Sequence, residues 1–140
     1  MNAAPELSLE DRQALQDVMQ RYAAAVDDRD LTAYAELFTE DVGVHGFADD
    51  VIEGRDAWVA FVTRALERFG ATQHLLAPQL ARATAAGAHC RTDFQATHEL
   101  ADRPERLFVL WACYETDLVR TPNGWRIHRH ELVRRAERTW

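Results

Sequence analysis

One carboxylate and two imidazoles, Asp27, His74 and His98, are placed where they could share a site. Asp27 ends a predicted helix, where the helix dipole disfavours a negative charge and calls for a partner. A carboxylate beside a histidine sets its tautomer and stabilises its protonated form, so the histidine can act as a base near neutral pH. A second histidine can donate to a carbonyl or protonate a leaving group. This set could remove a carbon-bound proton without a cofactor.

The elements that would position Asp27 lie in the first half of the chain. Ser8 followed by Asp11 resembles a capping box, after which apolar residues recur at helical spacing. The expected elements are a helix over 8–27, a short helix capped by Asp30 and running through Phe38, a strand over 42–45, and a third helix that opens at Gly54 and is ended by Gly70.

The two histidines lie in the second half, where the pattern changes to period two. The expected strands cover residues 72–84, 88–100, 107–121 and 125–138. Pro122-Asn123-Gly124 is the strongest hairpin signal in the chain. Helices first and a strand meander afterwards predict an α+β fold: three N-terminal helices packed on a curved, mostly antiparallel sheet. We expect a conical, barrel-like shape that encloses a pocket.

Pairing of the first two long strands would bring His74 and His98 together. A tight turn near residue 86 pairs strand positions whose numbers sum to about 172, so the two histidines become cross-strand neighbours on one face. Taken singly, each of the three candidates has a plain structural alternative. Asp27 could be a helix-end residue beside an arginine, and either histidine could be a buried residue with satisfied hydrogen bonds. Their expected convergence favours a site.

A second group of residues could form the pocket wall and bind the substrate. Each aromatic member has a core role as its alternative. The candidates are Tyr22, Tyr34, His45, Trp58, Phe94, Trp111 and Tyr114.

Composition excludes several classes of function. The chain has 140 residues and a net charge of −7, which disfavours nucleic-acid binding. All of its basic residues are arginine, so Schiff-base chemistry and a phosphate-loop lysine are excluded. No apolar run approaches the ~20 residues of a membrane helix, and no secretory signal is visible, so we expect a cytoplasmic protein without membrane contact. Cys90 and Cys113 lie in apolar stretches and are expected to be buried.

Two groups of residues could in principle bind a metal. Asp27, His74 and His98 could form a two-histidine, one-carboxylate triad. His128 and His130 would place two imidazoles on one strand face, although arginines surround them. We expect no metal at either place and interpret the second pair as a solvated or interface face of the strand.

Several motifs carry a family resemblance. They are Arg21-Tyr22-Ala23 with Val26-Asp27-x-Arg29-Asp30, Leu37-Phe38-Thr39-Glu40-Asp41-Val42, Thr72-Gln73-His74, and Tyr114 through Gly124-Trp125-Arg126-Ile127. Nearly the whole chain resembles SnoaL-like proteins of the nuclear-transport-factor-2-like superfamily, and is most similar to scytalone dehydratase and hexachlorocyclohexane dehydrochlorinase. The resemblance implies a single domain over 1–140 that works without metal or cofactor, with Asp27, His74 and His98 at the positions of catalytic residues.

The resemblance also shows departures. The dehydratase has a tyrosine where this chain has Val26, and a serine and an asparagine where it has Ala112 and Tyr114. The carboxylate–histidine pair is kept while the groups that hold the substrate differ, so a different substrate is implied.

The expected function is a cofactor-independent lyase of the dehydratase type, or an isomerase. His74, oriented by Asp27, would abstract a carbon-bound proton from a hydrophobic, ring-bearing molecule such as a polyketide, aromatic or terpenoid compound, assisted by His98. One alternative is an epoxide hydrolase or polyketide cyclase on the same fold. Another is a non-catalytic ligand carrier, or a subunit resembling the β subunit of ring-hydroxylating dioxygenases. A homodimer or homotrimer is expected.

Overall fold

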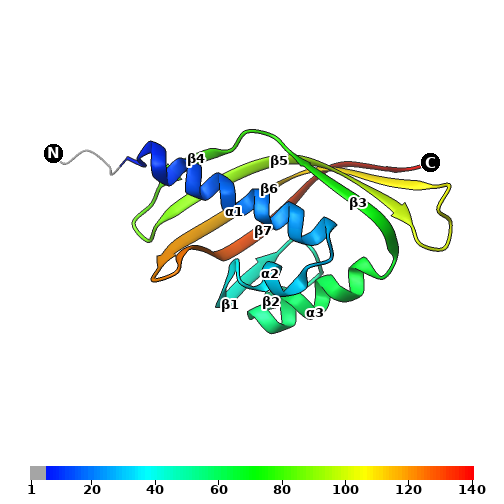
Figure 1. Ribbon diagram of the computed structural model, residues 1–140, viewed down its shortest axis with the longest axis horizontal. Coiled ribbons are helices and arrows are strands. Elements are labelled where there is room, and N and C mark those ends of the chain that lie inside the picture. Colours follow the sequence, from blue (N-terminus) through cyan, green and yellow to red (C-terminus); the bar gives the residue numbers. More distant parts are fainter. Residues whose placement is uncertain (1–5) are drawn as a thin grey trace.

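The computed structural model describes residues 6–140, which form an α+β fold with helices on one side of a curved, open sheet (Figure 1). This confirms the predicted fold class. The elements are α1 (Leu9–Asp27), α2 (Leu31–Ala35), β1 (Phe38–His45), β2 (Ile52–Glu53), α3 (Arg55–Leu66), β3 (Phe69–Leu76), β4 (Leu80–Ala83), β5 (Ala88–Leu100), β6 (Leu107–Thr121) and β7 (Gly124–Thr139).

The sheet has the strand order β2-β1-β7-β6-β5-β3, with β4 also paired to β5. All pairings are antiparallel except β1 with β7, which run parallel. Figure 1 shows α1 crossing the strands, with α2 and α3 grouped near its C-terminal end. The C-terminal end of α1 therefore lies beside β3, the strand that carries His74.

Helix α1 forms where its apolar stripe and its cap predict it. The Ser8 side chain accepts a hydrogen bond of 3.0 Å from the backbone N–H of Asp11, which satisfies one of the free donors at the helix start. The stripe is buried against the sheet, with Leu15 fully buried and Met19 nearly so. Because the helix ends at Asp27, that carboxylate is positioned at the edge of the core.

The second and third helices are shorter than expected. Asp30 does cap α2, accepting 3.1 Å from the N–H of Ala33, but α2 ends at Ala35. Phe38 instead begins β1, because its backbone pairs with β7. Likewise α3 ends at Leu66, and Gly70 lies inside β3 rather than ending a helix.

The strand expected over residues 72–84 is divided into β3 and β4. Ala77 still donates its N–H to the carbonyl of Asp93, at 2.8 Å, but Pro78 follows and has no N–H for the ladder. Both pieces pair with β5, so the interruption does not detach either of them from the sheet. Over residues 6–140, no helix is long and apolar enough to cross a membrane.

Candidate active site

Asp27 and His74 are in direct contact. His74 Nδ1 lies 2.8 Å from Asp27 Oδ1, and the backbone N–H of His74 donates to Asp27 Oδ2, also at 2.8 Å. One bond comes from the strand backbone and the other from the ring. The carboxylate therefore orients the imidazole relative to the strand that carries it.

Two further side chains hold the Asp27 carboxylate in place. The Thr72 hydroxyl donates to Asp27 Oδ1 at 2.9 Å. Arg29 donates in turn to that hydroxyl at 2.9 Å, to the carbonyl of Val26 at 2.8 Å, and to the carbonyl of Gly70. Arg29 adopts a left-handed backbone conformation, with φ of 59°, directly after the helix. It thus connects the end of α1 to the start of β3.

The protonation states of this pair follow from its hydrogen bonds. Partial burial pushes the pKa of Asp27 upward, but the bonds from the His74 ring, the His74 backbone and Thr72 outweigh it, so the pKa is lowered. Asp27 is therefore ionised at neutral pH and only accepts hydrogen bonds. Because the carboxylate only accepts, Nδ1 of His74 carries a proton, and in the neutral form of the ring Nε2 is the acceptor.

His98 lies beside His74, but not directly opposite it. The strand register pairs His74 with Ala96 and His98 with Thr72, two positions from the expected pairing, so the two histidines are diagonal neighbours. Their ring centroids are 5.7 Å apart. The expected shared face is therefore present, although the expected register is wrong.

The tautomer of His98 is set by the neighbouring strand. Its Nδ1 lies 3.1 Å from the carbonyl oxygen of Phe108, and because a carbonyl only accepts, Nδ1 carries the proton. Burial lowers the pKa of His98 to about 4. At neutral pH the ring is therefore uncharged, and Nε2 is an acceptor.

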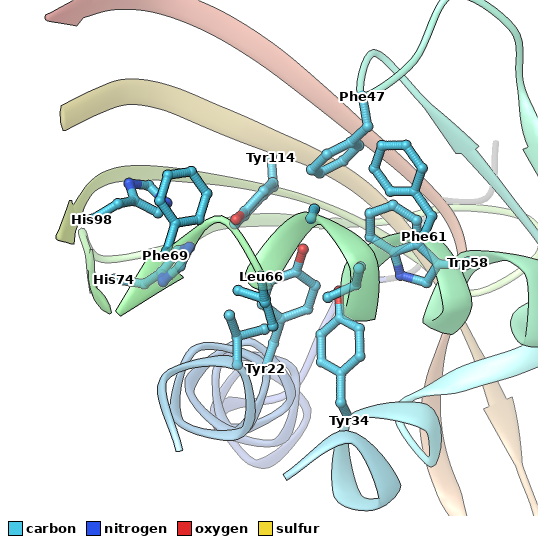
Figure 2. A pocket seen from close by; sticks show the side chains of 13 residues that line it. Tyr22, Tyr34, Phe47, Trp58, Phe61, Leu66, Phe69, His74, His98 and Tyr114 are labelled. Atoms are coloured by element: carbon cyan, nitrogen blue, oxygen red, sulfur yellow. The ribbon is translucent and has the colours of Figure 1, made fainter. Parts of the chain in front are cut away.

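His74 and His98 both line a cavity between the helices and the sheet (Figure 2). Its inner part has a volume of about 110 Å³ and is surrounded mostly by aromatic and aliphatic side chains. The lining residues are Tyr22, Val26, Tyr34, Phe47, Trp58, Phe61, Val62, Ala65, Leu66, Phe69, His74, His98 and Tyr114. Asp27 is not among them, but it contacts His74, which is.

A wider outer part, of about 480 Å³, continues from the inner one. Both parts share Phe47, Phe61, Ala65, Phe69, His74, His98 and Tyr114. Phe94 lines the outer part, and Arg68, Arg134 and Glu137 supply its charged groups. A molecule could therefore reach the histidines from the outer part and insert an apolar portion among the aromatic rings.

Two of the expected wall residues point away from the cavity. His45 ends β1, where Val42 and Val44 are the inward-facing residues, so the alternation of the strand turns His45 to the outer face. Trp111 also faces outward, donating from its indole to the Gln95 side chain at 3.2 Å. Both expectations were wrong because each rested on residue type and not on the face of the strand. Tyr22, Tyr34, Trp58, Phe94 and Tyr114 line the cavity as expected.

His128 and His130 do not share a strand face. The register of β7 against β6 shifts between the pairs Asp117–Arg129 and Leu118–Ile127, and the extra residue of this bulge reverses the alternation. His128 is consequently exposed, whereas His130 is fully buried. The expectation of a solvated pair is thus wrong for His130.

Buried His130 belongs to the wall behind the cavity. Its Nδ1 is 3.1 Å from the Thr116 hydroxyl and its Nε2 is 3.0 Å from the Tyr22 hydroxyl. Burial lowers the pKa of His130 to about 3, so the ring is neutral. It holds the Tyr22 hydroxyl in place from the sheet side.

Several lining residues escaped sequence reasoning. Phe61 and Leu66 lie on α3 and line the cavity, and their helical spacing with Trp58 and Val62 is a usable signal for the face that packs toward the sheet. Phe47 lies in a loop, and Phe69 begins β3 three residues before the expected strand. Arg29 and Thr72 carried no signal for a hydrogen-bonded support of Asp27.

The described residues show little capacity for metal binding. Within residues 6–140, no group of three histidine, cysteine or acidic side chains is arranged to hold an ion. Cys90 and Cys113 are buried and unpaired, as expected, and burial raises the pKa of the Cys90 thiol to about 12. The titratable residues that line the inner cavity are two histidines and three tyrosines.

Comparison with known proteins gives relatives by sequence and solved structures of the same fold. An uncharacterized protein of Mycobacterium tuberculosis, Rv2910c, is 32% identical over 124 residues, which cover 86% of this chain and 83% of the relative. A solved structure from Novosphingobium aromaticivorans, named as a candidate scytalone dehydratase, has 23% identity and a TM-score of 0.85, covering 93% of this chain and 87% of that one.

A type 2 hexachlorocyclohexane dehydrochlorinase, LinA, has 16% identity and a TM-score of 0.83, covering 94% and 90%. At such identities these two structures establish the fold alone. The family model for the SnoaL-like domain matches residues 7–131, which is most of the chain. By sequence model and by fold, the chain belongs to the SnoaL-like domain family, with the nuclear-transport-factor-2-like fold.

Proposed function

We propose that this protein is a cofactor-independent lyase of the dehydratase type, or an isomerase, that begins its reaction by removing a proton from carbon. The observation that carries the proposal is the 2.8 Å contact between Asp27 and His74 at the wall of an apolar cavity. The pair supplies a base, Nε2 of His74, and His74 lines the cavity. A water-excluding wall strengthens the electrostatic support of that base.

The proton balance of this step involves two residues of the chain. His74 Nε2 takes the proton, and the electron pair of the C–H bond moves into the substrate, where it forms a double bond or an enolate. The resulting imidazolium is stabilised by the ionised carboxylate of Asp27. In an elimination of water, the leaving hydroxyl takes the proton back from the His74 imidazolium and departs as water, which restores the base. In an isomerisation, the imidazolium returns the proton to another carbon.

His98 is proposed to position the substrate rather than to donate a proton. Its Nδ1–H is committed to the Phe108 carbonyl, so the neutral ring offers only an unprotonated Nε2. Such a nitrogen accepts a hydrogen bond from a substrate hydroxyl. Donation to a carbonyl or a leaving group would first require protonation, which burial opposes.

The proposed substrate is a hydrophobic, ring-bearing molecule. The inner cavity is surrounded by rings, including a stack of Trp58 on Phe61 with centroids 5.7 Å apart. The names of the structural relatives, a candidate dehydratase and a dehydrochlorinase, support elimination as the reaction class. Epoxide hydrolysis has less support, because among the described residues no aspartate or glutamate lines the inner cavity.

Hydrogen–deuterium exchange at carbon tests the proposed step without knowledge of the natural substrate. The protein is incubated in D₂O with 1-indanone and 2-indanone, and deuterium at the carbons beside the carbonyl is followed by NMR. We expect the wild-type protein to accelerate exchange and His74→Gln to lose the acceleration. Exposed His128 provides the matched control, because His128→Gln should exchange like the wild type.

Equal acceleration by His74→Gln and by the wild type would contradict the proposal. Loss of the acceleration in both glutamine variants would also contradict it, because the effect would then not belong to the cavity. Binding of the ketones is measured in parallel by calorimetry, so that failure to bind is distinguished from failure to exchange.

A further inference from the structure

The outer part of the cavity has three charged side chains in its wall, Arg68, Arg134 and Glu137. Glu137 and Arg134 form an ion pair, with Oε2 and Nη1 3.5 Å apart, so these two charges largely offset each other. Arg68 has no carboxylate within the 4.0 Å of an ion pair among residues 6–140. Within the described part of the chain, the outer wall therefore carries one positive charge that no acidic side chain balances.

The place of Arg68 is set by the junction between α3 and β3. Arg68 directly precedes Phe69, the first residue of β3, and its guanidinium lies over the Phe69 ring, 5.3 Å from the ring centroid. Phe69 packs in turn against His98, with ring centroids 4.5 Å apart, and Figure 2 shows these two side chains next to each other in the lining. One aromatic ring therefore separates the guanidinium from the histidines. Arg68 is exposed, so an entering ligand can reach it.

The volumes of the two parts indicate that a bound molecule extends toward this guanidinium. The inner part, of about 110 Å³, is small for a ligand site, since such sites typically have roughly 300–1,000 Å³. The outer part has about 480 Å³, and His74 and His98 line both parts. A ring-bearing molecule whose C–H faces His74 would therefore place one portion among the inner aromatic side chains and another in the outer part.

We infer that Arg68 binds a carboxylate group of the ligand in the outer part of the cavity, so that the substrate is a hydrophobic, ring-bearing acid. A guanidinium stays charged at neutral pH, and its N–H groups form a planar fork that matches the two oxygens of a carboxylate. The whole chain has a net charge of −7, which repels anions, so an acidic ligand gains from a local cation at the entrance.

This inference adds the substrate class to the proposed function, and it rests on that function only in taking the bound molecule to be the substrate. The carboxylate would lie in the outer part, while the acidic C–H faces His74 where the two parts meet. The two groups would then occupy opposite ends of a ring system. Because the carboxylate stays away from the reacting carbon, Arg68 acts on substrate binding and not on proton transfer.

A purely structural role for Arg68 makes a different prediction. A cation near the C-terminal end of a helix interacts favourably with the helix dipole, and a guanidinium over an aromatic face adds a cation–π contact. If these contacts were the whole role of Arg68, its replacement would lower the stability of the free protein. It would then affect charged and neutral ligands alike.

Binding of a matched pair of probes tests the carboxylate site. Dissociation constants of 1-oxoindane-5-carboxylate and of the corresponding neutral carboxamide are measured by calorimetry for the wild type, Arg68→Met and Arg64→Met. We expect the wild type to prefer the carboxylate by roughly 2- to 10-fold, as one charge-assisted pair at an exposed site allows. Arg68→Met should lose this preference. Arg64→Met is the matched control and should keep it, because Arg64 is an exposed arginine of α3 that lines neither part of the cavity.

Three results would overturn the inference. They are a wild-type protein without preference for the carboxylate, an unchanged preference in Arg68→Met, and an equal loss of preference in Arg64→Met. Methionine keeps an apolar stem over Phe69, and the ratio of the two constants cancels changes in the shape of the cavity. A structural effect of the substitution therefore leaves the ratio unchanged.

A second variant should change the affinity in the opposite direction. Glu137→Gln releases Arg134 from its ion pair and removes a negative charge from the same wall. The carboxylate should then bind more tightly, while the affinity for the carboxamide stays as in the wild type. Weaker binding of the carboxylate by Glu137→Gln would overturn the inference.

The outcome for the carboxylate site is separable from that for the proposed function. The same probe pair is measured with His74→Gln, which removes the base and leaves Arg68 in place. A carboxylate preference that survives in this variant, together with loss of deuterium exchange, supports both proposals. A preference in a wild-type protein that shows no exchange would support the carboxylate site and reject the base. Exchange without any preference would support the base and reject the carboxylate site.

Discussion

Replacing Asp27 with asparagine should reverse the tautomer of His74. Three donors converge on the carboxylate: the His74 backbone N–H on Oδ2, and the His74 ring and the Thr72 hydroxyl on Oδ1. Asparagine offers one oxygen and one NH₂ group in place of two oxygens. The NH₂ side of the amide must therefore face a group that donates a hydrogen bond to the carboxylate in the wild type.

The backbone N–H of His74 decides which way the amide turns. That N–H cannot change its direction or become an acceptor, so the asparagine oxygen should face it. The NH₂ group then faces His74 Nδ1 and the Thr72 hydroxyl. The hydroxyl can rotate and accept, and the ring can accept on Nδ1 if its proton moves to Nε2. The base nitrogen then carries a proton and cannot accept another.

The size of the effect follows from the contacts that the active tautomer would lose. With Nδ1 protonated, the ring N–H and the amide NH₂ would oppose each other, which leaves two buried donors unsatisfied at about 1–3 kcal/mol each. A total of about 2–6 kcal/mol corresponds to a roughly 30-fold to 10⁴-fold loss of proton-transfer rate. The equivalent exchange in a serine protease triad, which also produces the wrong tautomer, costs about 10⁴-fold.

Nitrogen-15 NMR of the imidazole rings measures this tautomer without a substrate. We expect the His74 signals to show a protonated Nδ1 in the wild type and a protonated Nε2 in Asp27→Asn. Deuterium exchange into 1-indanone should decrease in parallel. Asp41→Asn is the matched control, because Asp41 is exposed and its carboxylate pairs with exposed His128, away from the cavity. A protonated Nδ1 in Asp27→Asn, or a full exchange rate alongside a protonated Nε2, would refute the reasoning.

Three further outcomes are expected. The free energy of unfolding should fall by roughly 4 kcal/mol between pH 7 and pH 5, because the folded-state pKa values of His98 and His130 are about 4 and about 3. Both lie below the ~6.5 of an unfolded histidine, so the unfolded chain binds protons first as the pH falls. Urea titrations check this, and a double His→Gln variant that keeps the same pH slope would contradict it. Arg29→Met should slow deuterium exchange several-fold with little change in ketone affinity, because it frees Thr72 from its guanidinium partner. An unchanged rate of deuterium exchange would show that the hydrogen bond from Arg29 to Thr72 is not needed for the reaction. His130→Ala should cost about 2–3 kcal/mol by leaving a cavity and an unpaired Tyr22 hydroxyl, whereas His128→Ala should cost less than about 0.5 kcal/mol. Thermal unfolding compares the two variants. Equal losses of stability would contradict the prediction that buried His130 stabilises the fold more than exposed His128 does.

The elements that the sequence determined by itself are those governed by local rules. The cap at Ser8 and the apolar stripe defined α1 to its end at Asp27, because capping and helical spacing act within a few residues. The strands β5 and β6 lie where alternation and the hairpin signal placed them. The meeting of Asp27 with His74 was also predictable, since it needed only a helix end beside the following strand.

What the tertiary structure alone decided depends on relations between elements. The bulge opposite Asp117 separated His128 from His130, and the pairing of β3 with β5 placed His74 two residues from its expected partner. No local pattern encodes such a shift, because a single extra residue in one strand changes which side chains face inward while leaving the composition unchanged. Likewise, only the packing of α2 and α3 against the sheet removes Tyr34 and Trp58 from water.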